Sequence, residues 1–423
     1  MLQQRLWRFA KASLLAYRER GLGGGTRYIL MTIRRKAALL LLHWASRREI
    51  AALRAGLAVS RVAASPGSVH IALAVSGGIG DLLVVARFMR DVAATAGPLR
   101  FDVFAKRPGI TAWLFQNVDG FGCAYPDSLF HPVLADYDIA LRANTFVFTY
   151  SAQLQWSRIC QNRRLAEVVF ALLCNRAAFD EFVELHPYRD NELVRNIVRG
   201  GWTRRDYLHH LAGISYGGDR FDVPCAPDAL AKFGLEGRRY VTVHNGFDTD
   251  FIVTGQTATK CYPHFGKVVA LLRRARPDIL FVQLGTVTSE VIAECDVNLI
   301  KLTSLRDAAA LIAGAALHLD NEGGLVHLAA CLGTRSVVVF GPTPADYFGY
   351  DANINLSPPV CGDCWWTTRS WMDKCAEGFA EPRCMTEQMP DTVAAHALDV
   401  LPRARPVADA GWVPVATVHR SNA

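Results

Sequence analysis

The sequence predicts an α/β protein with two Rossmann-like domains and a cleft between them, preceded by a basic helical segment. After residue 66, short apolar runs alternate with stretches of helical spacing, which is typical of parallel sheets covered by helices on both faces. This alternation is interrupted near Gly217-Gly218 and at Pro224 to Pro227, where we expect a linker. The chain has 423 residues, of which 51% are hydrophobic and 20% charged, so two domains with separate cores are expected.

The first α/β series occupies residues 67–227, which we predict as one domain. Its predicted strands are Val69–Val75, Phe101–Ala105, Asp138–Arg142 and Thr145–Tyr150. Its predicted helices are Asp81–Ala94, Ala152–Asn175, Tyr188–Arg199 and Asp206–Ala212.

The second series occupies residues 228–402, with residues 403–423 as a tail. Its predicted strands are Tyr240–His244, Ile279–Leu284, Leu299–Leu302, Leu317–Asp320 and Ser336–Phe340. Its predicted helices are Tyr262–Ala275, Ser289–Cys295, Arg306–Ala313 and Leu325–Leu332, the last of which ends at Gly333.

The basic character of the chain lies in residues 1–66, the predicted N-terminal extension. This segment holds 13 Lys and Arg and 2 acidic residues, a charge of +11, so with a total of +7 the remainder carries 7 − 11 = −4. The overall pI of 8.9 therefore gives no support to nucleic-acid binding. Three amphipathic faces follow one another here, with Leu6 on the first, Leu40 on the second and Leu53 on the third. They suit either docking on an anionic inner-membrane surface or packing on the enzyme body.

The clearest functional motif begins at Asp320 and ends at Tyr350. Glu322-Gly323-Gly324 precedes a helix, and a helix that starts after glycines offers free N–H groups and a positive dipole end to a phosphate. A short strand follows and ends in the rigid turn Gly341-Pro342-Thr343-Pro344. Ligands bind at the carboxyl ends of strands in such sheets, so this region predicts a nucleotide site.

These residues resemble the nucleotide-sugar site of the heptosyltransferases, glycosyltransferase family nine. In that family a D-[ST]-G-L-x-H-L-A-A run precedes a strand that ends in F-G-P-T. The matching positions here are Glu322, Gly323, Gly324, Leu325, His327, Leu328, Ala329 and Ala330, followed by Phe340, Gly341, Pro342 and Thr343. The acidic position is Glu322 instead of Asp, which keeps the charge and lengthens its reach. The resemblance extends over about residues 69 to 402 and implies the two-domain GT-B architecture.

The resemblance also implies roles for residues in both halves. Gly77-Gly78-Ile79-Gly80-Asp81 matches the loop that carries the family's general base, so Asp81 is expected to take a proton from the acceptor hydroxyl. By itself, the same aspartate is most simply a residue of the first turn of a helix, facing the helix dipole. Thr259-Lys260 matches T-K-x-W-P, with Tyr262 in place of Trp. Lys260 would balance the charge of the departing diphosphate, and no catalytic metal is then expected.

Three further residues are expected near the donor. Asn245-Gly246 matches a small glycine turn of the family, and Glu290 lies near the position of its ribose-binding glutamate. His244 stands where an apolar residue or proline is usual, and we interpret it as a buried histidine with a hydrogen-bond partner.

The cysteines fall into two groups. Cys361, Cys364, Cys375 and Cys384 lie within 24 residues in a predicted Cys-rich loop, 361–384. Their C-x2-C spacing suits a structural zinc or iron ion, although reduced cysteines packed against tryptophans are the alternative. Seven others are scattered, and we expect them to be small buried hydrophobic residues in a reducing, cytoplasmic compartment.

We therefore expect an inverting glycosyltransferase that uses a nucleotide-diphosphate sugar, which the family suggests is ADP-heptose. The acceptor would be a bacterial surface glycan, a lipid-linked core sugar or a protein hydroxyl. An oxidoreductase is disfavoured because neither half has G-x-G-x-x-G with an acidic residue about 20 positions on. A non-catalytic, nucleotide-binding scaffold at the membrane surface remains as the alternative.

Overall fold

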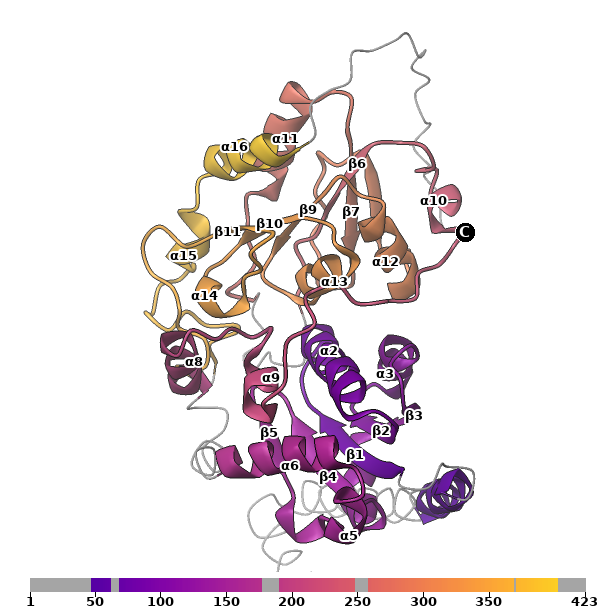
Figure 1. The fold of residues 1–423 in the computed structure, drawn as a ribbon. Coiled ribbons are helices and arrows are strands. Elements are labelled where there is room, and N and C mark those ends of the chain that lie inside the picture. The colour runs from indigo at the N-terminus through magenta and orange to yellow at the C-terminus, as the bar shows by residue number, and fades with distance from the viewer. Residues whose placement is uncertain (1–46, 62–67, 177–189, 248–257, 369, 402–423) are drawn as a thin grey trace, which may run out of the picture.

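The chain folds into two α/β halves whose helices meet between two separate sheets (Figure 1). The structure is a computed structural model that describes residues 47–61, 68–176, 190–247, 258–368 and 370–401. Five strands form the first sheet and six form the second. The predicted two-sheet GT-B architecture is thereby confirmed, while the predicted domain limits stay predictions.

The first sheet has the strand order β3-β2-β1-β4-β5. Strand β1 lies at the centre, and all seven of its residues are buried. Only β5 runs antiparallel, against β4, and the other pairs are parallel. The strands are β1 Val69–Val75, β2 Leu99–Ala105, β3 Phe121–Pro126, β4 Ile139–Ala143 and β5 Val147–Thr149.

Helices cover the first sheet, and one of them is shorter than predicted. The helix expected over residues 152–175 is interrupted, because residues 156–159 and 163–176 form separate helices and the chain breaks before Arg163. The Asn162 side chain accepts the Leu165 N–H at 3.0 Å and donates to the Ala96 carbonyl at 2.7 Å, which starts a new helix there. The helices are α2 Ile79–Ala96, α3 Pro108–Phe115, α4 Phe130–Val133, α5 Trp156–Ile159, α6 Arg163–Arg176, α8 Asp190–Arg199 and α9 Tyr207–Ala212.

The second sheet is parallel throughout, in the order β11-β10-β9-β6-β7-β8. The strands are β6 Tyr240–Val243, β7 Leu280–Gly285, β8 Val297–Ile300, β9 Leu317–Asn321, β10 Ser336–Val339 and β11 Ile354–Leu356. The helices are α10 Ala229–Lys232, α11 Phe265–Ala275, α12 Leu305–Ala313, α13 Gly324–Leu332, α14 Ala345–Phe348, α15 Arg383–Thr386 and α16 Pro390–Val400.

Two predicted elements of the second half differ from the structure. Residues 289–295 form a loop instead of a helix, because the buried Gln283 side chain takes its backbone groups. Gln283 accepts the Ile292 N–H at 2.8 Å and donates to the Glu290 carbonyl at 2.6 Å. The helix expected from Tyr262 begins only at Phe265, and the Tyr262 hydroxyl donates to the Gln388 carbonyl at 2.8 Å.

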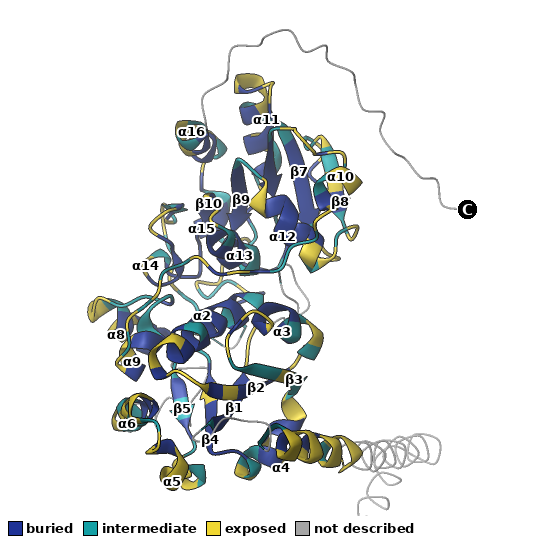
Figure 2. Ribbon diagram, turned by 45° about the vertical axis from the view of Figure 1, so that its right-hand side comes forward, coloured by how far each residue is buried: buried dark blue, intermediate teal, exposed yellow. Residues whose placement is uncertain are grey.

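Helices α2 and α13 pack against each other and join the two halves. The contact is close at Gly80, where a Cβ atom would lie 2.5 Å from Cδ2 of His327. Only glycine therefore lets α2 approach α13 this closely. One apolar cluster includes buried residues of both halves, such as Leu83 and Leu328. Figure 2 shows the inner strands of both sheets buried, whereas the edge strand β3 is partly exposed.

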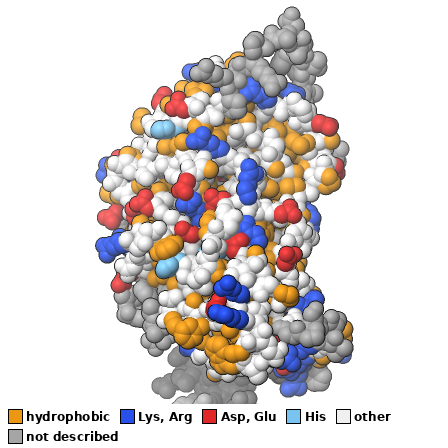
Figure 3. Space-filling view, in the orientation of Figure 1, with side chains coloured by type: hydrophobic (Ala, Val, Ile, Leu, Met, Phe, Trp, Pro, Cys, Tyr) orange, Lys and Arg blue, Asp and Glu red, His pale blue; other side chains and the backbone are white. Residues whose placement is uncertain are grey.

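The third amphipathic face of the N-terminal extension packs on the body. Residues 47–61 are helical, and Leu53 and Leu57 are buried against the apolar cluster that includes Phe130. Arg54 donates to Asp136 at 2.7 Å. The first two faces lie outside the described residues. Among the residues that the structure describes, no helix is long and apolar enough to cross a bilayer. On the face in Figure 3, basic and acidic side chains are interspersed.

Candidate active site

Asp81 lies in the first turn of α2, directly after the glycine loop that follows β1. Its Oδ2 accepts the Gly78 N–H at 2.9 Å. Gly77 has φ +105°, and a Cβ atom there would lie 2.0 Å from the same oxygen. The loop therefore needs glycine both for its left-handed backbone and to leave room for the carboxylate. One oxygen of Asp81 thus serves the helix terminus, as the simpler interpretation of this residue expected.

The other oxygen of Asp81 binds Arg204, which the sequence analysis missed. Arg204 Nη2 lies 2.6 Å from Asp81 Oδ1, and Nη1 donates to the Asn144 carbonyl at 2.9 Å. Arg204 is only 2% exposed. Burial opposes its charge, but Tyr347 and Asp81 nevertheless raise the pKa of Arg204. The only sequence signal was the pair Arg204-Arg205 just before α9.

Three cationic side chains lie near His327 in α13. His327, in the first turns of this helix, lies with Nδ1 2.7 Å from the Tyr350 hydroxyl. Burial holds the pKa of His327 well below 6.5, and the neighbouring Arg87, Arg204 and Lys260 lower it further. A neutral histidine therefore stands among three cations, where the helix dipole adds further positive potential. Such a site attracts an anion.

Lys260 and Glu322, both predicted donor residues, bind each other in this structure. Lys260 Nζ lies 3.4 Å from Glu322 Oε2, and the two side chains are 13% and 9% exposed. Glu322 Oε1 lies 3.9 Å from Nε2 of His327. Lys260 sits in a turn before α11, and the neighbouring Thr259 hydroxyl donates to the Trp371 carbonyl at 2.7 Å. This turn therefore places the Lys260 side chain beside Glu322, just before the start of α13.

A chain of buried polar groups lies behind this turn, at the carboxyl ends of β6 and β9. His244 Nδ1 lies 2.8 Å from Asp320 Oδ1, so the expected partner of His244 is present. Asp320 Oδ2 lies 3.2 Å from His318, whose other ring nitrogen contacts Thr242 at 2.9 Å. Burial opposes the charge of Asp320, but His244 and His318 hold its pKa below the usual range.

Asn245, Gly246 and Glu290 lie on neighbouring loops at the same edge of the second sheet. The Asn245 side chain donates to the Glu290 carbonyl at 2.9 Å, and Asn321 donates to the Gly246 carbonyl at 3.3 Å. The Glu290 residue is exposed. The Glu290 carboxylate also contributes to raising the pKa of Cys261 to about 12, an effect caused mainly by burial. The structure therefore connects these residues to the Asp320–Glu322 segment through Asn321.

The Gly341-Pro342-Thr343 turn is covered by the Cys-rich loop. Asp363 donates its N–H to the Gly341 carbonyl at 3.2 Å, and Trp365 donates to the Pro342 carbonyl at 2.8 Å. Thr343 is 1% exposed. The turn is therefore held from the side of the loop, and its carbonyl groups face that loop.

The four clustered cysteines lie near one another. Burial raises the pKa of Cys384 to about 12, and the thiols of Cys361, Cys364 and Cys375 raise it further. The thiol donor set has the chemistry of a zinc or iron site. Within the described part of the chain, however, no group of three or more potential ligands has an arrangement that would hold an ion.

The prediction for the seven scattered cysteines is largely wrong. Cys331 is buried, whereas Cys123, Cys160 and Cys174 are exposed. The remaining three, Cys225, Cys261 and Cys295, are partly buried. Surface helices and an outer strand carry the exposed ones, so composition could not show which side they face.

Two hollows differ in where they lie relative to the predicted site residues. One of about 660 Å³ lies between β11 and α16 and includes none of the predicted site residues. The other, of about 10 Å³, lies beside Asp81's loop and is lined by Gly77, Gly78, Lys106 and Arg107, among others. This second hollow lies where the carboxyl ends of β1 and β2 meet.

Residues 233–360 match the sequence model of glycosyltransferase family 9 (heptosyltransferase). The match includes Lys260, Glu322 and the Gly341-Pro342-Thr343 turn. It confirms the resemblance over this part of the chain and, with it, the prediction of a glycosyltransferase. No curated protein matches the chain.

Several solved structures share the general arrangement. The ADP-heptose LPS heptosyltransferase II of E. coli is 15% identical, with 78% of this chain and 98% of that chain covered and a TM-score of 0.45. The family 9 glycosyl transferase of Veillonella parvula is 11% identical, with coverages of 80% and 99% and a TM-score of 0.48. The iron-containing dodecameric glycosyltransferase TibC of enterotoxigenic E. coli is 11% identical, with coverages of 79% and 76% and a TM-score of 0.47. At these values the likenesses add no argument about function.

Proposed function

We propose that this chain, a glycosyltransferase of the heptosyltransferase family, moves a sugar from a nucleotide-diphosphate donor to a hydroxyl acceptor with inversion at the anomeric carbon. The single observation that supports this most is the approach of two loops across the α2–α13 contact. Gly80, next to Asp81, touches His327 in α13, and Lys260 and Glu322 meet at the start of the same helix. A base from one half thus lies near an anion site in the other.

The second half would bind the donor. The N–H groups at the start of α13, together with Lys260, suit a diphosphate, and the buried Arg87 near His327 adds to the positive potential there. Stabilising the leaving diphosphate with fixed positive groups lowers the barrier without a metal ion. Glu322, with Glu290 nearby on the exposed loop, would hold the ribose hydroxyl groups. ADP-heptose is the donor that the family suggests.

Asp81 would act as the general base. Each of its carboxylate oxygens has one partner in this structure, and the side chain is 27% exposed. An ionised carboxylate can accept about four hydrogen bonds, so capacity remains for the acceptor hydroxyl. Removing that proton as the oxygen attacks the anomeric carbon makes the hydroxyl a better nucleophile. The acceptor would be a bacterial surface glycan, a lipid-linked core sugar or a protein.

Two accompanying proposals concern the periphery of the enzyme. The four clustered cysteines do not form a metal site as they are arranged here. We propose that they close around a structural zinc or iron ion, which would then brace the loop over the Gly341-Pro342-Thr343 turn. Residues 1–46 would bring the enzyme to the anionic inner face of a bacterial membrane from the cytoplasm, because their charge is strongly basic.

The function is tested by a donor panel followed by transfer. Full-length protein is screened by thermal shift against nucleotide sugars and free nucleotides, since a ligand that binds the folded state raises its melting temperature. Donors that bind are then incubated with lipopolysaccharide core, lipid-linked and protein acceptors, and transfer is followed by mass spectrometry. Binding without any transfer or donor hydrolysis would favour the scaffold alternative.

Asp81→Asn is the matched catalytic test. It should reduce turnover by about 10²–10⁴-fold while donor binding changes little. It should also lower thermal stability, because Arg204 stays buried without its carboxylate partner. Donor affinity measured by calorimetry at a temperature well below the melting point separates the two effects. Turnover close to that of the wild type would show that another group is the base.

A further inference from the structure

We propose that Arg204 is a positioning residue that holds the Asp81 carboxylate for proton removal and couples its orientation to the donor half. This role rests on the proposed function of Asp81. It concerns a residue outside the matched motifs and outside the family match, which begins at residue 233.

Arg204 and the glycine loop hold the carboxylate from two directions. Arg204 Nη2 binds Oδ1 at 2.6 Å, and the Gly78 N–H binds Oδ2 at 2.9 Å. Arg204 is itself fixed by Asn144, whose carbonyl and side-chain oxygens lie 2.9 and 3.2 Å from its Nη1 and Nη2. Asn144 in turn donates to the Ser76 carbonyl at 3.1 Å, at the end of β1. The orientation of the carboxylate is therefore set by Gly78 and Arg204, and Arg204 is held through Asn144 to the residue that follows β1.

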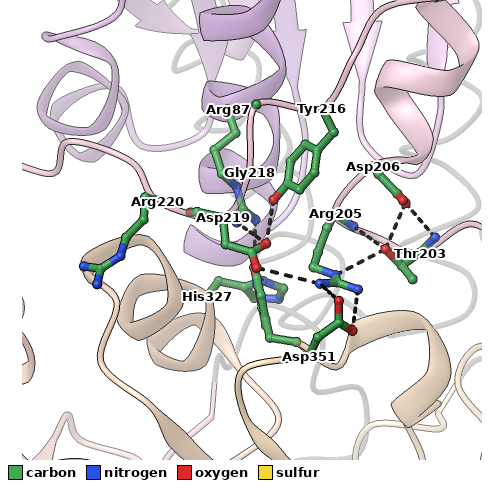
Figure 4. A network of polar contacts seen from close by, with 12 residues as sticks. Arg87, Thr203, Arg205, Asp206, Tyr216, Gly218, Asp219, Arg220, His327 and Asp351 are labelled. Atoms are coloured by element: carbon green, nitrogen blue, oxygen red, sulfur yellow. Dashed lines mark hydrogen bonds and ion pairs between the residues drawn. The ribbon is translucent and has the colours of Figure 1, made fainter.

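The same arginine is attached to the second half through its backbone. The Arg204 N–H donates to the Tyr347 carbonyl in α14 at 2.9 Å. Its neighbour Arg205 binds both carboxylate oxygens of Asp351 at 2.9 Å, and the turn is closed by Asp206, which accepts from Thr203 (Figure 4). Asp219 of the connecting segment also faces Arg205, at 3.7 Å (Figure 4).

The turn at residues 203–206 is thus a bridge between the halves. One side chain reaches the base in the first half, while the backbone and the next side chain reach the segment that follows the Gly341-Pro342-Thr343 turn. A shift of that segment would move Arg204 and, through it, the carboxylate. Misplacing a catalytic group by about 1 Å can cost about 10²-fold in rate, so this bridge makes the geometry of the base depend on the donor half.

A direct role in substrate binding fits the contacts less well. The side chain of Arg204 is 3% exposed, and both terminal nitrogens have protein partners. Binding a substrate phosphate would require breaking the ion pair with Asp81. A positioning residue should therefore affect kcat and leave the donor KM almost unchanged.

The experiment compares Arg204→Gln, Arg204→Lys and Asp81→Asn with the Asp81→Asn/Arg204→Gln double variant in steady-state transfer assays. We expect Arg204→Gln to lower kcat by about 10–10²-fold with the donor KM within about threefold. Arg204→Lys should recover part of the loss, because one ammonium reaches Asp81 but cannot also hold Asn144. The double variant should be no slower than Asp81→Asn by more than about twofold, since Arg204 acts only through that carboxylate.

Arg276→Gln is the control for the loss of a buried arginine that is paired with a carboxylate. Arg276 is 9% exposed and binds Asp278 at 2.8 Å beyond the end of α11, so its loss should leave kcat unchanged. All variants are first compared by thermal unfolding. If Arg204→Gln does not fold, Arg204→Lys replaces it as the test variant.

The outcomes separate this role from the proposed function. Wild-type protein that transfers no sugar from any donor refutes the function and this role together. If the wild type transfers and Asp81→Asn is slower by about 10²–10⁴-fold, three results overturn the role alone. They are an unchanged kcat in Arg204→Gln, a raised donor KM with unchanged kcat, or fully additive losses in the double variant.

Discussion

Replacing Lys260 with alanine should weaken binding of ADP far more than binding of adenosine. Lys260 lies 3.4 Å from Glu322, and both side chains are mostly buried beside the start of α13. A charge-assisted contact with a phosphate contributes roughly 1.5–3 kcal/mol, which corresponds to about 10- to 150-fold in affinity. Adenosine lacks the diphosphate, so its affinity should change by less than about twofold if Lys260 acts as we propose.

The same substitution has a cost for the free protein. The Glu322 side chain is 9% exposed, and without Lys260 its carboxylate loses its cationic partner at 3.4 Å and keeps the His327 ring at 3.9 Å, which burial holds neutral. Removing one partner of a fully buried pair costs about 3–5 kcal/mol. Because the Lys260–Glu322 contact is long and partly exposed, we expect a smaller loss of unfolding free energy here, about 1–3 kcal/mol. The melting temperature should therefore fall even without nucleotide.

The assay is calorimetric titration of ADP and adenosine into the wild type, Lys260→Ala, Glu322→Gln and Lys267→Ala. Lys267 is an exposed lysine on α11 and serves as the matched control, for which both affinities should stay the same. Glu322→Gln should weaken ADP and adenosine equally, because the ribose is common to both. Equal losses of ADP and adenosine binding in Lys260→Ala would refute a phosphate role for this residue.

Three further predictions follow from the same contacts. Gly80→Ala should destabilise the protein by about 1–3 kcal/mol, because the new Cβ atom would lie 2.5 Å from His327 Cδ2. Gly56→Ala is the control, since a Cβ atom there has nothing within 4 Å and should be neutral or slightly stabilising. Urea unfolding of both variants measures the difference. The free energy of unfolding should fall as the pH drops below 6.5, because the pKa of His327 is lowered in the folded state and the unfolded chain takes up the proton first. His327→Gln should remove up to about 1.4 kcal/mol per pH unit of that loss, and parallel pH profiles of the two proteins would contradict the assignment. Purified protein should carry about one zinc or iron ion per chain by mass spectrometry, and a Cys361→Ser/Cys364→Ser variant should lose this ion. Transfer should need no added divalent ion. Metal-free wild-type protein of full stability would rule the structural ion out.

Several parts of the site could be predicted because their signal is local. Glycines around Asp81 and before α13 mark close approach of backbone, and the apolar strands before them fix the edge of the sheet at which they lie. The sequence could not show that residues 289–295 form a loop instead of a helix, because this depends on a single buried glutamine on β7 that hydrogen-bonds to backbone groups of the loop. Similarly, the break before Arg163 depends on an asparagine that bonds to the end of α2.

By itself, the sequence determined most of the strands and helices, the two α/β halves and the position of the motif that matches the family, although β3, α3 and β11 were not predicted. These features follow from hydrophobic periodicity and glycine placement, which act over a few residues. Only the tertiary structure decided which charges meet. Arg204 reaches Asp81 across 123 positions, and Lys260 reaches Glu322 across 62. Such pairs depend on how helices and loops from distant parts of the chain pack together, and no local pattern specifies that geometry.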